Sequence, residues 1–130
     1  MEQALQKIKE ASEGLLYRSE SDYPFELIHT KALSVALEQE LISSSNKGTD
    51  TKVETVTLEH FFRNMVTVYP DASAEQEMMA LKFKNLQDVL LYELRDVSVY
   101  KIGNVQVDVF IIGQLPDGSY GGLRTKVIET

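Results

Sequence analysis

Two histidines are the first candidates for chemistry in this sequence, because imidazole can act as an acid, a base or a metal ligand near neutral pH. His29 and His60 are 31 residues apart, and neither belongs to an H-x-x-x-H or H-E-x-x-H pattern. Each is therefore interpreted as a partly exposed structural residue. A hydrolase that uses His29 or His60 with nearby carboxylates remains an alternative.

A glycine-rich segment, residues 118–122, is followed by Lys126, which is reminiscent of a phosphate-binding loop. A P-loop, however, leads into a helix that begins with Lys and Ser or Thr, whereas this segment leads into a predicted strand. It is interpreted as a loop or bulge in an antiparallel sheet. The serines form no G-x-S-x-G motif and no nucleophile arrangement with a histidine and an acid. The sequence therefore disfavours an enzyme.

The composition indicates a folded chain that does not bind nucleic acid. Its 130 residues have the length of one domain, residues 1–130, and its apolar and charged fractions are 43% and 25%. Thirteen Lys and Arg oppose 20 Asp and Glu, which gives a net charge of -7. An acidic surface repels a phosphate backbone and favours a basic partner.

The absence of cysteine excludes disulfides, thiol catalysis and thiolate metal sites. The first eight residues are too polar for a secretory signal, and no run approaches the roughly 20 apolar residues of a membrane span. We therefore expect a cytoplasmic protein that has no contact with a membrane.

The N-terminal part of the chain is expected to contain two helices and one strand. Apolar residues recur at helical spacing from Ala4 to Leu15, and Gly14 is placed to end that helix. Residues 19–22 form an exposed acidic loop before a strand over residues 23–29. A short helix is expected over residues 34–42, followed by a surface loop.

The middle of the chain is expected to form a short strand over residues 52–56 and then two helices. Thr57 is placed to cap the first helix, and a turn follows over residues 69–72. Ser73 and Gln76 have the spacing of a capping box. A long helix should follow them, with a regular apolar stripe of Met79, Phe83, Leu86, Leu90 and Leu94.

The last third of the chain changes to the alternating pattern of strands. Gly103-Asn104 and Pro116-Asp117-Gly118 are predicted turns, which divide this region into three strands, the last over residues 123–128. Three consecutive strands joined by tight turns predict an antiparallel meander, and helices must cover it. The fold class is therefore α/β.

Both ends of the sequence resemble the cyanobacterial nuclease A inhibitor family. Residues 14–26 match its N-terminal signature, with the sequence GLLYRSESDYPFE, and residues 99–113 and 125–130 are similar to its last strands and terminus. Phe61-Phe62 and Lys82-Phe83 fall where similar residues are expected. The resemblance implies an α/β/α sandwich with a largely antiparallel C-terminal meander, and an intracellular protein.

The resemblance also implies a function and two contact residues. Members of the family block a magnesium-dependent, sugar-non-specific endonuclease of the ββα-metal type, without catalysis, a cofactor or nucleic-acid binding of their own. By motif, Glu20 pairs with a cationic catalytic side chain of the nuclease. Thr130 supplies a hydroxyl or terminal carboxylate oxygen to the nuclease's magnesium, so that the two residues together imitate the scissile phosphate.

The third contact of the family, an Asp-Trp pair before the long helix, is not reproduced, because the chain contains no tryptophan. Residues 69–72 lie there instead, and Asp71 retains the acidic part. An acidic interaction module of the same fold with a different partner is therefore the main alternative.

Overall fold

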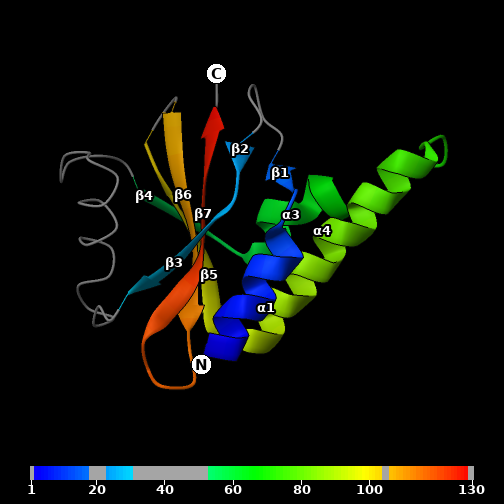
Figure 1. Ribbon diagram of the computed structural model, residues 1–130. Helices are drawn as coiled ribbons and strands as arrows, with labels where there is room; N and C mark the ends of the chain where they lie inside the picture. Colours follow the sequence, from blue (N-terminus) through cyan, green and yellow to red (C-terminus); the bar gives the residue numbers. More distant parts are fainter. Residues whose placement is uncertain (1, 18–22, 31–52, 104–105, 129–130) are drawn as a thin grey trace.

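The computed structural model describes residues 2–17, 23–30, 53–103 and 106–128 (Figure 1). The described residues form both helices and an antiparallel sheet, which confirms the α/β class. The elements in chain order are α1 (Glu2–Ser12), β1 (Leu16–Tyr17), β2 (Tyr23–Pro24), β3 (Glu26–Thr30), β4 (Val53–Val56), α3 (Leu58–Val66), α4 (Ala74–Glu93), β5 (Arg95–Ile102), β6 (Gln106–Gln114) and β7 (Tyr120–Ile128).

The described strands form a five-stranded antiparallel sheet in the order β3-β7-β6-β5-β4 and a separate β1-β2 pair. The predicted meander is present as β5, β6 and β7, and the turn at Pro116-Asp117-Gly118 joins the last two strands. Strands β3 and β4 extend the meander on its two sides. In β3, Glu26 lies opposite Arg124 of β7, so a segment near the N-terminus pairs with the last strand.

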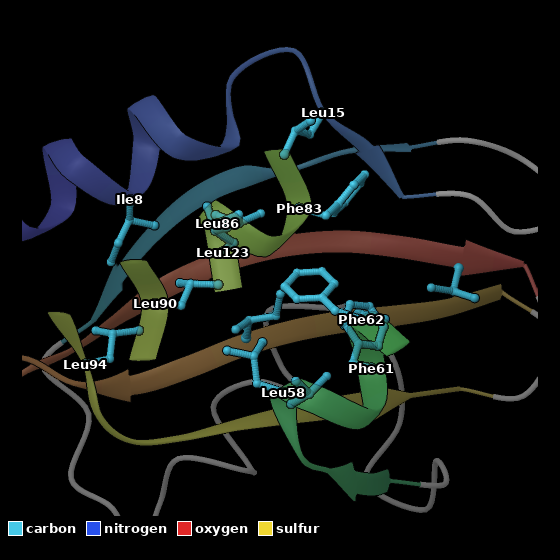
Figure 2. Packing of buried hydrophobic residues seen from close by; sticks show 14 of the residues in the cluster. Ile8, Leu15, Leu58, Phe61, Phe62, Phe83, Leu86, Leu90, Leu94 and Leu123 are labelled. Atoms are coloured by element: carbon cyan, nitrogen blue, oxygen red, sulfur yellow. The ribbon is translucent and has the colours of Figure 1, made fainter. Parts of the chain in front are cut away.

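The described helices α1, α3 and α4 all cover the same face of the sheet (Figure 1). Figure 2 shows their apolar side chains packed over the strands, with Phe62 and Phe83 near the centre. The centroids of these two rings are 5.8 Å apart. A sandwich needs a second helical layer on the other face. The helix predicted over residues 34–42 lies outside the described residues, so the described part of the chain has one helical layer.

The helix ends follow the local sequence as predicted. The Thr57 side chain accepts a hydrogen bond from the His60 N–H at the start of α3. At the start of α4, Ser73 and Gln76 exchange both hydrogen bonds of the capping box, at 2.8 and 3.1 Å. Gly14 follows α1 with a φ of 77°, a conformation that favours glycine.

Two strands differ from their predicted limits. The strand predicted over residues 23–29 is divided into β2 and β3 at Phe25, because the Phe25 ring packs among the helix rings, 6.1 Å from Phe62. The final strand begins at Tyr120 instead of residue 123. Gly122 is part of this strand. Only glycine fits at this position, because a Cβ there would lie 1.7 Å from the Ile111 carbonyl oxygen.

A smaller apolar cluster lies on the other face of the sheet, formed by Ile102, Phe110 and Ile112. The Arg124 guanidinium lies 5.3 Å from the Phe110 ring centroid and 3.7 Å from the Asp108 carboxylate. None of the helices in the described part of the chain has the length and apolar character needed to cross a bilayer.

Candidate functional site

The β1-β2 pair is the stem of the acidic loop that the sequence singled out. Tyr17 pairs with Tyr23, so the chain leaves and returns to the fold at one point. The Tyr17 ring stacks on the Phe61 ring of α3, with centroids 4.3 Å apart and planes 7° from parallel. Its hydroxyl also donates a hydrogen bond to the Phe61 carbonyl oxygen across 2.9 Å. The stem is therefore fastened to the helical layer.

The same stem is fastened to the last strand. The buried Thr125 hydroxyl of β7 donates a hydrogen bond to the Pro24 carbonyl oxygen at 2.9 Å, and the Tyr23 carbonyl oxygen lies 3.4 Å away. Figure 1 shows the C-terminal end of β7 at the same end of the sheet as β1 and β2. The loop stem and the end of β7 therefore form one continuous structural unit.

The two contact residues implied by the family, Glu20 and Thr130, lie outside the described residues. The structure describes their chain neighbours instead. Tyr17 and Tyr23 flank the segment that contains Glu20, and Ile128 precedes Thr130 by two residues. These flanking residues belong to β1, β2 and β7, and Figure 1 shows β1, β2 and the C-terminal end of β7 at one end of the sheet.

Asp71, the third predicted contact residue, is exposed in the turn between α3 and α4. The turn is closed by a hydrogen bond from the Ala72 N–H to the Tyr69 carbonyl oxygen at 3.0 Å. Both Asp71 and Tyr69 line an open groove of about 940 Å³ between the end of α3 and the start of α4. Met78 and Glu75 of α4 lie along the same groove.

The sequence predicts Tyr69 only as a turn residue. The structure exposes 62% of its surface beside Asp71. The sequence signal that could have identified Tyr69 is its position two residues before Asp71, a candidate contact acid. Large aromatic side chains that are left exposed are common anchors of protein interfaces, so Tyr69 joins the candidate residues.

His29 contacts a serine and, through it, an aspartate in the turn between β6 and β7. His29 Nε2 lies 2.9 Å from Ser119 Oγ, and that hydroxyl donates to Asp117 Oδ1 across 2.6 Å. The hydrogen bonds from the Ser119 hydroxyl and N–H lower the pKa of Asp117. In a catalytic triad, the histidine donates a hydrogen bond to the acid, and the serine hydroxyl donates its hydrogen bond to the imidazole. Here the serine proton goes to the acid, which is a turn-stabilising arrangement.

His60 is exposed on the surface of α3, as expected from the sequence. Its backbone N–H donates a hydrogen bond to the Thr57 side-chain oxygen, and its backbone carbonyl oxygen accepts one from Arg63 Nη1 at 2.6 Å. Across residues 2–17, 23–30, 53–103 and 106–128, no three His, Asp or Glu side chains gather closely enough to hold a metal ion. The two histidines thus lie on separate elements, and each is surrounded by hydrogen bonds that stabilise local structure.

Comparison with known families adds to what the geometry shows. A family model described as nuclease A inhibitor-like protein, NuiA, matches residues 2–130. The chain belongs to the nuclease A inhibitor-like family. The match includes the loop stem, the α3-α4 turn and the end of β7, so the NuiA resemblance covers every part of the candidate site. No curated protein matches the chain. Membership in the NuiA family indicates a nuclease inhibitor with a nuclease as its partner.

Proposed function

We propose that this protein inhibits a magnesium-dependent, sugar-non-specific endonuclease of the ββα-metal type by plugging its active site. The observation that carries the proposal is the bond between Thr125 and Pro24. It holds the stem of the loop that contains Glu20 against the strand that leads to Thr130. Two groups that act together in one cleft need such a common support.

The chemistry of the two residues suits a nuclease cleft. A carboxylate at Glu20 makes a charge-assisted hydrogen bond with a cationic catalytic side chain, and an oxygen of Thr130 is the kind of hard ligand that magnesium accepts. A phosphodiester presents the same two features to the nuclease, a negative charge and a metal-bound oxygen. The plug therefore competes with nucleic acid without being cleaved.

The turn between α3 and α4 supplies a third contact in this proposal. Asp71 and Glu75 give it negative charge, and the exposed Tyr69 gives it an aromatic side chain near the position of the missing family tryptophan. The N-terminus of α4 carries the positive end of the helix dipole, which partly offsets these negative charges. This effect is limited to the first turn of the helix. An acidic rim with one aromatic anchor suits the basic border of a nuclease cleft.

Removal of Thr130 tests the plug most directly. Inhibition should weaken by ~10- to 1,000-fold, since one central contact is lost while the fold stays intact. The assay titrates the protein into such a nuclease while DNA hydrolysis is followed, with the unfolding transition as a control for the fold. An unchanged inhibition constant in the shortened chain would remove Thr130 from the mechanism.

Glu20→Gln tests the loop, because it keeps the shape of the side chain and removes its charge. If Glu20 pairs with a desolvated cation, the change should mainly raise the dissociation rate. Glu26→Gln, an exposed position on β3, is the matched control. A change confined to the association rate and its salt dependence would make Glu20 a peripheral steering charge.

Absence of inhibition at micromolar excess across several nucleases of this type would contradict the proposal as a whole. It would favour an acidic interaction module with another partner. Turnover of nucleic acid or an ester by the protein alone, abolished by His29→Ala or His60→Ala, would favour a hydrolase.

A further inference from the structure

The groove between the end of α3 and the start of α4 gathers most of the methionines of the chain. Three of the four methionines in the sequence, Met65, Met78 and Met79, line this groove of about 940 Å³. Met78 exposes 60% of its surface, and Met65 and Met79 are half-buried. We name this surface, together with Tyr69 and Phe83 that also line it, the methionine groove.

The open position of these side chains suits a binding surface better than a core. An unbranched thioether changes its rotamer easily, so methionine fills irregular gaps in a core and adapts to different partners at a surface. Here Met78 is exposed next to Tyr69 and Val68, which expose 62% and 48% of their surface and line the same groove. Large apolar side chains that are exposed together in one hollow indicate a contact site, unlike single ones that are scattered over a surface.

The charges around the groove are mostly negative. Asp71 and Glu75 line it, and Lys82 is the one base among the described residues that do so. A smaller hollow shares Lys82 with the groove and is also lined by Glu10 and Glu13 of α1. The two hollows together therefore have four acids and one base. A segment that matches this surface carries basic side chains beside apolar ones.

The methionine groove also lies toward the end of the molecule that carries the proposed plug. Figure 1 shows the start of α4, the β1-β2 pair and the C-terminal end of β7 toward the same end of the molecule. The groove adjoins α3, which is fastened to the loop stem by the stacked rings of Tyr17 and Phe61. An enzyme that cleaves DNA and RNA needs basic side chains around its cleft, because they hold the phosphate backbone.

We propose that the methionine groove receives a basic segment from the border of the nuclease's active-site cleft. Apolar side chains of that segment enter between Met78 and Tyr69, and its lysines or arginines meet Asp71 and Glu75. The proposal rests on the proposed function, because it takes the nuclease as the partner. It extends the contact from the turn at Asp71 onto the side of α4. Since methionines adapt their shape, the groove accepts segments that differ in sequence.

NMR of the whole protein with isotope-labelled methionine methyl groups tests the groove directly. Addition of an equimolar amount of such a nuclease, without nucleic acid, should shift the signals of Met65, Met78 and Met79, which single Met→Leu variants assign. Unchanged signals at concentrations where the nuclease is inhibited would overturn the groove and leave the plug in place. Shifted signals without inhibition would support the groove and contradict the plug.

Met78→Lys places a cation where the basic segment is expected to lie. Affinity for the nuclease, measured by calorimetry, should fall by ~10-fold or more, because like charges then meet in an apolar groove. Leu91→Lys is the matched control, since it adds the same charge at an α4 position that is 43% exposed and does not line the groove. Equal affinities of the two folded variants would overturn the proposal.

Glu75→Gln and Lys82→Gln test the sign of the charge that the groove receives. Glu75→Gln removes an acid and should weaken binding by ~2- to 5-fold, whereas Lys82→Gln removes the base and should leave binding unchanged or tighten it. The opposite order would indicate an acidic segment and overturn the proposal. A chain that does not bind any nuclease of this type, with unchanged methionine signals, would overturn both the groove contact and the proposed function.

Discussion

The Thr125 hydroxyl donates a hydrogen bond to the Pro24 carbonyl oxygen at 2.9 Å, although the two residues are 101 positions apart in the chain. Thr125 is buried in the last strand, and Pro24 belongs to the stem of the acidic loop. This bond is a direct link between the two ends of the sequence that carry the proposed plug. Its loss should affect both the stability of the fold and the strength of inhibition.

Thr125→Val removes the donor and keeps the shape of the side chain. The Pro24 carbonyl oxygen then loses a partner in a partly buried place, so the free energy of unfolding should fall by about 1–3 kcal/mol. Urea unfolding measures this loss, and Thr55→Val at an exposed position on β4 is the control. Equal stability losses at positions 125 and 55 would show that the bond contributes nothing specific.

Tyr17→Phe keeps the ring that stacks on Phe61 and removes only the hydroxyl that bonds its carbonyl oxygen. The free energy of unfolding should fall by about 0.5–1.5 kcal/mol. Tyr23→Phe, across the strand pair, is the matched control. Amide exchange of the β1 and β2 residues should accelerate in the first variant and not in the second. Unchanged exchange would mean that the ring alone holds the stem.

Gly122→Ala should be one of the most destabilising single changes in the sheet. The new Cβ would lie 1.7 Å from the Ile111 carbonyl oxygen, so the two strands would have to separate. We expect a loss of about 3 kcal/mol or more. Gly14→Ala meets no atom within 4 Å and should lose only the roughly 1–2 kcal/mol of a left-handed backbone. Thermal unfolding of both variants compares them, and similar losses would contradict the close approach.

Asp117→Asn should reveal a contribution to stability that depends on pH. The Ser119 hydroxyl and N–H hold the pKa of Asp117 below its ordinary value of 3.8. Because the folded state binds this proton more weakly than the unfolded state, the contribution is present above that value and is lost as the pH falls through the lowered pKa. The stability difference between the original chain and the variant should therefore shrink as the pH falls below 3.8 and through the lowered pKa of Asp117.

Urea unfolding across that range measures the difference, and Asp88→Asn controls for the loss of one exposed negative charge. A difference that stays constant with pH would mean that the Asp117 carboxylate has no preferred charge state in the fold.

Elements whose signals are local were predictable from the sequence. The capping box of Ser73 and Gln76 depends on residues three positions apart, and the turn at Pro116-Asp117-Gly118 depends on adjacent ones. The alternation of apolar and polar residues in the last third of the chain predicts strands, and the tight turns between them predict the meander. In each case the residues that decide the structure are neighbours in the chain.

Features that depend on distant contacts were not predictable in the same way. Nothing near Glu26 indicates that it lies opposite Arg124, because this pairing is decided by the packing of the whole sheet. The break at Phe25 has the same origin, since the ring is drawn into a cluster formed by helices that follow much later. For the site, the contact roles of Asp71, Glu20 and Thr130 all stay predictions, and the exposure of Tyr69 emerged only from the fold.

The stacking of Tyr17 on Phe61 has a consequence for the choice of partner. Because the loop stem and α3 share this contact, and α3 leads directly into the turn with Asp71, the stem and the turn are held at a fixed separation in the free protein. No ordering entropy is then spent on aligning the two regions. Nucleases whose cleft and border are spaced differently would be rejected by geometry, even where their charges are the same.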